Sequence, residues 1–222
     1  MSDENEHPAA EPAAPERLPL FHDETRARRR RGCSGLVGVV LVAAAFGGIA
    51  GLIGGRITGL VVAGVIALPL VYLMAYNLRR RVWLEGTTLL VRTWGVRRVD
   101  LVGAERLDLV IGDVRGTRTV SLLVNAGQRG KVAKVDLAVF SGAGGRELGV
   151  LQLRRLANAL LNNTEANGLV FSELLVAELR SEARGDAVAD RPLYRLASAA
   201  PSGKYVQRFT MEAVSRFVAT LD

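Results

Sequence analysis

Two long charge-free stretches near the N-terminus constrain the fold of this chain more than any other feature. Residues 32–55 carry no charged side chain, residues 57–78 carry none either, and only Arg56 separates them. Each stretch is long enough to cross the ~30 Å hydrocarbon core of a bilayer, which takes roughly 20 apolar residues in a helix. One continuous helix over both would extend about 70 Å at ~1.5 Å per residue, about twice the distance needed. The sequence therefore predicts a transmembrane helical hairpin over residues 32–78, with spans at about 34–53 and 57–77.

The charges around the two stretches predict how the hairpin is oriented. Short flanks rich in Lys and Arg stay on the cytoplasmic side of a membrane. Arginine clusters precede the first span and follow the second, which predicts a multi-pass protein of the cell membrane with both termini in the cytoplasm and Arg56 at the outer tip. Tyr72, Tyr76 and Trp83 near the inner end suit the membrane interface. The same arginines are the candidate contacts for anionic lipid: Arg28, Arg29, Arg30, Arg31, Arg79, Arg80 and Arg81. The alternative is a buried core hairpin of a soluble protein, although such cores seldom contain two neighbouring apolar runs of this length.

The hairpin is rich in glycine, and the turn is expected at Gly54–Arg56. Gly47, Gly51 and Gly59 belong to a series spaced four residues apart. Small residues at this spacing let helix backbones approach closely in lipid. One interpretation is packing within the hairpin, and the other is homo-oligomerisation through Gly47 and Gly51.

Residues 1–31 are predicted to form a disordered acidic tail that ends in the first arginine run. Residues 1–25 contain seven acids and one base among Pro and Ala. Few apolar groups are available there to offset the entropy lost on ordering. A short apolar patch at Leu18–Phe21 either docks on a partner or a membrane, or is part of the flexible arm.

The sequence contains no set of residues that indicates catalysis. Cys33 is the only cysteine, which excludes an intrachain disulfide and a cysteine-based zinc site. Metalloprotease, hydrolase and dinucleotide-binding motifs are absent from the sequence. Asp108 and Asp113 flank a predicted strand and are expected to be solvated. We therefore predict no enzyme, no catalytic residue, no metal and no cofactor. The excess of Arg over Lys, with abundant Ala and Gly, is typical of a high-GC bacterial source.

Short β-rich segments follow the hairpin from Val82 onward. Such strands at this spacing predict a sandwich or a barrel. They fall at 82–94 (with a turn at Glu85-Gly86), 96–101, 105–111, 117–124 and 132–140. An amphipathic helix is expected next, with Leu153, Leu156, Ala157, Leu160 and Leu161 on one face. Further helices are expected at 169–184 and near 211–221, whereas 193–199 and 205–209 fit more than one structure.

Part of this region resembles a known domain. The series Trp83-x-Glu85-Gly86-x-x-Leu89-x-Val91-Arg92, then Gly95, Val99-Asp100-Leu101 and Ala104-Glu105-x-Leu107, resembles the bacterial pleckstrin-homology-like (PH-like) domain found behind transmembrane segments. The resemblance covers about residues 80–163. It implies a seven-stranded, strongly bent β-sandwich closed by one C-terminal helix, and no catalytic residues. The expected chain is thus a membrane hairpin, a PH-like α+β domain at 82–163 and a helical extension at 164–222.

These features predict an integral membrane protein whose cytoplasmic PH-like module binds an unidentified protein, as a non-enzymatic adaptor or scaffold. The alternative is an anionic-lipid sensor or membrane-organising protein that also uses Arg97, Arg98, Arg115 and Arg118. Membrane lipids are partners in both cases. Nucleic acid is not expected, because the net charge of +7 is concentrated at the membrane flanks and no nucleic-acid-binding motif appears.

Overall fold

The chain has an α+β fold that divides into two compact units. The computed structural model describes residues 17–20, 25–127, 132–142, 144–201 and 206–221. In the first helix, side chains are described from residue 35 onward, apart from that of Asn77. One unit comprises Phe21–Val82 and Val91–Arg97, and the other comprises Met1–Leu20, Trp83–Leu90 and Arg98–Asp222. Most of the predicted acidic tail therefore lies outside the described residues.

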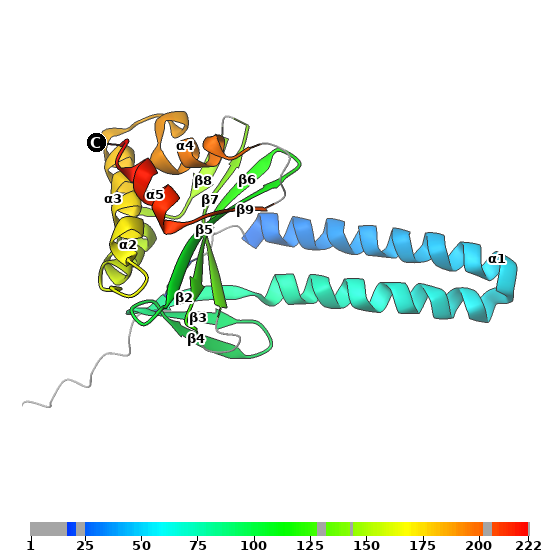
Figure 1. Ribbon diagram of the computed structural model, residues 1–222. Helices are drawn as coiled ribbons and strands as arrows, with labels where there is room; N and C mark the ends of the chain where they lie inside the picture. Colours follow the sequence, from blue (N-terminus) through cyan, green and yellow to red (C-terminus); the bar gives the residue numbers. More distant parts are fainter. Residues whose placement is uncertain (1–16, 21–24, 128–131, 143, 202–205, 222) are drawn as a thin grey trace, which may run out of the picture. The chain divides into compact units, whose positions relative to one another are not determined.

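The long apolar element α1 (Thr25–Arg79) is helical except at Gly55, where φ is 83° and ψ is 173°. Such a backbone conformation is essentially restricted to glycine. The break falls in the predicted turn, and α1 doubles back as two arms that lie side by side (Figure 1). Its segment Gly35–Tyr76 is long and apolar enough to cross a membrane, judged by length and composition.

Glycines allow the two arms of α1 to approach closely. A Cβ atom added at Gly59 would lie 2.6 Å from the carbonyl oxygen of Gly47 and 2.8 Å from the Cα of Gly51. A Cβ added at Gly47 would lie 2.7 Å from the Cβ of Ala63. All three distances are too short for a side chain, so the glycine spacing serves packing within the hairpin. Homo-oligomerisation through Gly47 and Gly51 stays a prediction.

The first antiparallel sheet has the strand order β1-β2-β3-β4. Its strands are β1 (Arg17–Pro19), β2 (Arg81–Glu85), β3 (Thr88–Arg92) and β4 (Val96–Asp100). Strand β1 differs from the expected disordered tail, because Leu18 pairs opposite Leu84 of β2. Leu18 and Leu20 are both buried. The apolar patch in the tail thus supplies an edge strand, and the burial of its two leucines offsets the entropy of ordering it.

The second antiparallel sheet has the strand order β8-β7-β6-β5-β9. Its strands are β5 (Arg106–Val114), β6 (Thr117–Asn125), β7 (Val132–Ser141), β8 (Gly144–Glu147) and β9 (Val206–Phe209). Arg115 and Gly116 join β5 to β6 with φ angles of 53° and 76°, as a two-residue hairpin of matching twist requires. Strand β9 pairs with β5. The predicted C-terminal extension at 164–222 therefore contributes an edge strand as well as helices, and the strand lies in the segment 205–209 that the sequence left open.

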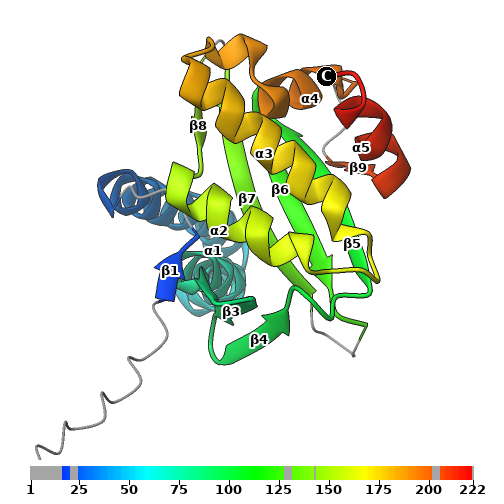
Figure 2. The same cartoon turned by 90° about the vertical axis from the view of Figure 1, so that its left-hand side faces the viewer.

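Helices cover one face of the second sheet, as Figure 2 shows for α2 and α3. The helical elements are α2 (Val150–Leu161), α3 (Gly168–Arg184), the 3-10 turn η1 (Val188–Asp190), α4 (Pro192–Ala199) and α5 (Met211–Val218). The expected apolar face of α2 is buried through Leu153, Leu156 and Leu160, whereas Leu161 is half exposed at 53 %. Fully buried side chains of α3 and of the sheet complete this core, among them Phe171, Leu174, Leu109, Ile111 and Leu122.

Candidate functional site

The predicted lipid-contacting arginines occupy different elements. Residues 28–31 lie in the first arm of α1, and their side chains are outside the described set. Arg79 ends the second arm, Arg80 follows it, and Arg81 opens β2. Arg79 and Arg81 are both exposed. The end of the second arm and the start of β2 therefore present two exposed arginines.

Arg79 belongs to an aromatic cluster at this end of α1. The ring of Trp94, in the bend after β3, stacks on the ring of Tyr72 with a centroid separation of 5.7 Å and an interplanar angle of 7°. The guanidinium carbon of Arg79 lies 4.6 Å from the centroid of the Trp94 ring, a cation–π contact. Trp94 keeps 55 % of its surface exposed. The Tyr72–Arg79–Trp94 cluster thus presents an indole and a cation together at the surface of one unit.

The chemistry of this cluster matches a membrane interface. Tryptophan and tyrosine rings favour the headgroup level, because one part of each ring is apolar and another is polar. A guanidinium beside them attracts phosphate and carries donors that suit its oxygens. The sequence predicts Tyr72 and Arg79 at the interface but indicates Trp83, and not Trp94, as the interfacial tryptophan. It gives no sign of the role of Trp94, because a β-hairpin separates Trp94 from α1 along the chain.

The further arginines proposed for lipid contact differ in how exposed they are. Arg97 and Arg98 are exposed on β4, and Arg115 is exposed in the β5–β6 turn. Arg118 is half-buried, pairs with Asp113 at 3.6 Å and donates to the carbonyl oxygen of Ala197 at 2.8 Å. Arg118 is thus used to hold β6 near α4.

The prediction that Asp108 is solvated is wrong, because Asp108 is buried. Its side chain is 6 % exposed and lies 2.9 Å from the Nε of Arg106 and 3.7 Å from Arg208. Arg208 comes from β9, which pairs alongside β5 in a register that places Arg208 opposite Val110. The strand pairing therefore supplies the second cation for a carboxylate that looked isolated in the sequence.

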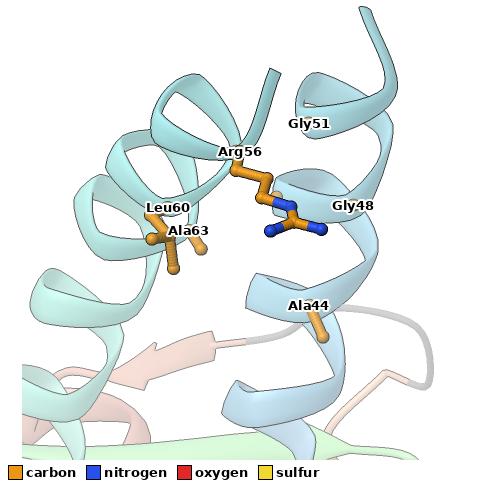
Figure 3. Close-up of a pocket in the computed structure, with 8 residues that line it drawn as sticks. Ala44, Gly48, Gly51, Arg56, Leu60 and Ala63 are labelled. Carbon is orange, nitrogen blue, oxygen red and sulfur yellow. The ribbon is translucent and has the colours of Figure 1, made fainter. Parts of the chain in front are cut away.

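A shallow apolar groove of about 430 Å³ lies between the arms of α1 (Figure 3). The side chain of Arg56 extends from the second arm towards the first, near Gly48. The remaining lining residues are small or apolar: Ala44, Gly47, Gly48, Gly51, Gly59, Leu60 and Ala63. Among the described residues that line the groove, Arg56 is therefore the one with an ionisable side chain.

Comparisons with known proteins return no match to a protein-family model, a curated protein or a solved structure. Within the described ranges, no group of three or more His, Cys, Asp or Glu side chains is arranged to hold a metal ion.

Proposed function

We propose that the chain is an integral membrane protein whose hairpin crosses the bilayer twice. The observation that carries this proposal is the apolar surface of α1. Large apolar side chains project outward all along both arms, with Leu52 90 % exposed and Ile57 80 % exposed. In water this surface would be unfavourable by roughly 25 cal/mol for each Å². Lipid is a solvent in which it carries no such cost, whereas the core of a soluble protein would have buried these side chains.

We also propose that the region after the hairpin is a PH-like module. Seven strands, β2 to β8, form two antiparallel sheets and are followed directly by the amphipathic helix α2. The number of strands and the helix after them are those that the sequence resemblance implies for residues 80–163, which supports the proposal. Strands β1 and β9 add to the sheet edges, so the proposed module is larger than the segment that resembles the family.

The function we propose is that of a non-enzymatic, membrane-anchored adaptor or scaffold. A PH-like module implies binding rather than catalysis, and the hairpin would hold it at the cytoplasmic leaflet. A second candidate is an anionic-lipid sensor. The observation that favours it is the Tyr72–Arg79–Trp94 cluster, where a cation lies on an exposed indole at the end of a proposed span.

The membrane topology is tested with reporter fusions in a bacterial host. Alkaline phosphatase fused after Asp222 should be inactive, because the arginine clusters retain both ends in the cytoplasm. The same reporter inserted at Gly55 should be active. An active C-terminal fusion would contradict an even number of spans and with it the cytoplasmic placement of the module.

The adaptor and the lipid sensor are separated with the full chain in lipid nanodiscs. An adaptor should capture a specific protein from the cytoplasmic fraction of its host in neutral and in anionic discs alike. A lipid sensor should instead show stronger quenching of Trp94 by brominated phosphatidylglycerol than by brominated phosphatidylcholine, measured in a Trp83→Phe background that leaves one tryptophan.

Two arginine variants decide whether such quenching reports on the cluster. Arg79→Gln removes the cation from Trp94 and should abolish the preference for phosphatidylglycerol. Arg92→Gln is the matched control, because Arg92 is exposed on β3. Lipid-dependent quenching without capture of a protein would overturn the adaptor in favour of the sensor.

A further inference from the structure

Two buried carboxyl groups meet between α3, β8 and the start of α4. Glu178, in the middle of α3, is fully buried, and the side chain of Glu147 at the end of β8 is 8 % exposed. The two side chains lie within hydrogen-bond reach of each other. The backbone N–H of Leu193, in the first turn of α4, donates to Glu178 Oε2 at 2.7 Å. Three separate elements thus converge on one carboxyl pair.

The charges around this pair do not balance when both carboxyl groups are ionised. Arg191, immediately before α4, donates from Nη1 to Glu147 Oε2 at 2.6 Å and from Nε to the carbonyl oxygen of Asp186 at 3.2 Å. Its charge also acts on Glu178 and Glu182 of α3. The nearby carboxylate of Asp186 accepts from Ser181 and Arg184. One guanidinium therefore faces three carboxyl groups, and it already forms a close pair with Glu147.

The hydrogen bonding of the pair is incomplete without a proton. Glu147 Oε1 and Glu178 Oε1 are both buried, and neither accepts a hydrogen bond from a described residue. Buried oxygens without a donor are costly, at about 1–3 kcal/mol each and more for a charged group. A single proton on Glu178 turns one of its carboxyl oxygens into a hydrogen-bond donor to Glu147. This one hydrogen bond gives a partner to an oxygen of each group.

The electrostatics of Glu178 agree with this arrangement. Burial is the largest cause that raises the pKa of Glu178, from an ordinary 4.5 to about 8. The carboxylate of Glu147 acts in the same direction, whereas the Leu193 N–H and the charge of Arg191 oppose the rise. Glu178 is therefore mostly protonated at neutral pH, and it loses its proton as the pH rises through about 8.

We propose that Glu178 and Glu147 form a proton-dependent latch that holds the segment Asp186–Ala200, with η1 and α4, against α3 and β8. With the proton in place, Glu178 bridges to β8 and accepts the N–H that opens α4. Without it, two carboxylates repel each other around one arginine. The closed latch binds the proton more tightly than the open one, so its stability is greatest below about pH 4.5 and falls as pH rises towards 8.

Hydrogen exchange measured by mass spectrometry on the full chain in detergent micelles tests this latch. Between about pH 5.5 and 8, the protection factor of peptides covering Asp186–Ala200 should fall by about tenfold per pH unit and then level off. Glu178→Gln keeps the shape and a permanent donor, so its protection should not change with pH. Glu173→Gln, an exposed carboxyl change on the same helix, should behave like the unmodified chain.

The outcome that overturns the latch is an equal pH slope in the unmodified chain and in Glu178→Gln. Lower protection in Glu178→Gln than in the unmodified chain near pH 6 would also overturn it, because the neutral form is the closed one. Glu147→Gln frees Arg191 to pair with Glu178 and should move the fall in protection to lower pH. An unchanged profile in that variant would exclude Glu147 from the latch.

Discussion

Leu160→Ala is expected to lower the free energy of unfolding of the β-rich unit by about 2–5 kcal/mol, because Leu160 on α2 is fully buried. The loss combines the transfer energy of the missing methyl groups with the cavity that remains. The total free energy of unfolding of a domain is only ~5–15 kcal/mol, so Leu160→Ala should remove a large part of it. The measurement is the denaturant midpoint of the full chain in detergent micelles, followed by circular dichroism.

Asn158→Ala is the matched control, because Asn158 lies on the exposed face of the same helix. Its effect should be about 0.5 kcal/mol or less. Small and equal shifts from both variants would mean that α2 is a surface appendage. In that case the proposed PH-like module would lose the helix that completes its core.

Asn163→Ala is expected to cost about 3 kcal/mol or more through hydrogen bonds alone. The Nδ2 of Asn163 donates to the carbonyl oxygens of Leu101 at 2.7 Å and Ala104 at 2.9 Å, and its Oδ1 accepts from the N–H of Ala166 at 2.7 Å. Asn163 is 1 % exposed. Each buried group left without a partner costs about 1–3 kcal/mol, so alanine loses several such terms at once.

Two further variants isolate the role of the donors of Asn163. Asn163→Asp keeps the shape and the acceptor but aims a carboxylate oxygen at two carbonyl oxygens, so it should be as damaging as alanine at neutral pH. Asn162→Ala changes the neighbouring, exposed asparagine and should shift the midpoint little. An Asn163→Asp protein as stable as the unmodified chain would contradict the stabilising role assigned to the two hydrogen bonds that Asn163 donates to Leu101 and Ala104.

The hairpin and the main secondary structure follow from patterns that are local in the sequence. The length of the apolar run and Gly54–Arg56 were enough to predict where α1 turns, because a helix longer than a bilayer must fold back and glycine alone tolerates the required conformation. The 3.6-residue spacing of Leu153, Leu156 and Leu160 predicted the buried face of α2 for the same reason: the signal lies within one element.

Pairings between distant segments were not predictable in this way. The sequence leaves the patch around Leu18 either as a docking segment for a partner or a membrane or as part of a flexible arm, whereas in the structure it pairs with β2. Strand β9 pairs with β5 across about ninety intervening residues. Edge strands this short carry almost no periodicity of their own, and the partner strand determines whether they form. Burial of Asp108 follows from the same pairing, since Arg208 arrives with β9.

The sequence does contain a sign that Glu178 is buried. Glu178 lies four residues after Leu174 and three after Leu175, on the apolar side of a predicted helix. A carboxyl group at such a position indicates a buried partner or a bound proton. Glu147 and Arg191 carry no comparable sign, because their roles depend on where β8 and the start of α4 lie relative to α3.

The sequence by itself determined the apolar hairpin, its turn, the strands between β2 and β7 and the helices α2, α3 and α5, because each rests on residue spacing, charge or glycine conformation within a single segment. Only the tertiary structure decided which polar groups meet. The Tyr72–Arg79–Trp94 cluster, the Asn163 bonds to residues 101–104 and the Glu147–Glu178 pair each join elements separated along the chain. Hydrogen bonds and ion pairs act over only a few Å, so their partners are set by how those elements pack and not by their distance in sequence.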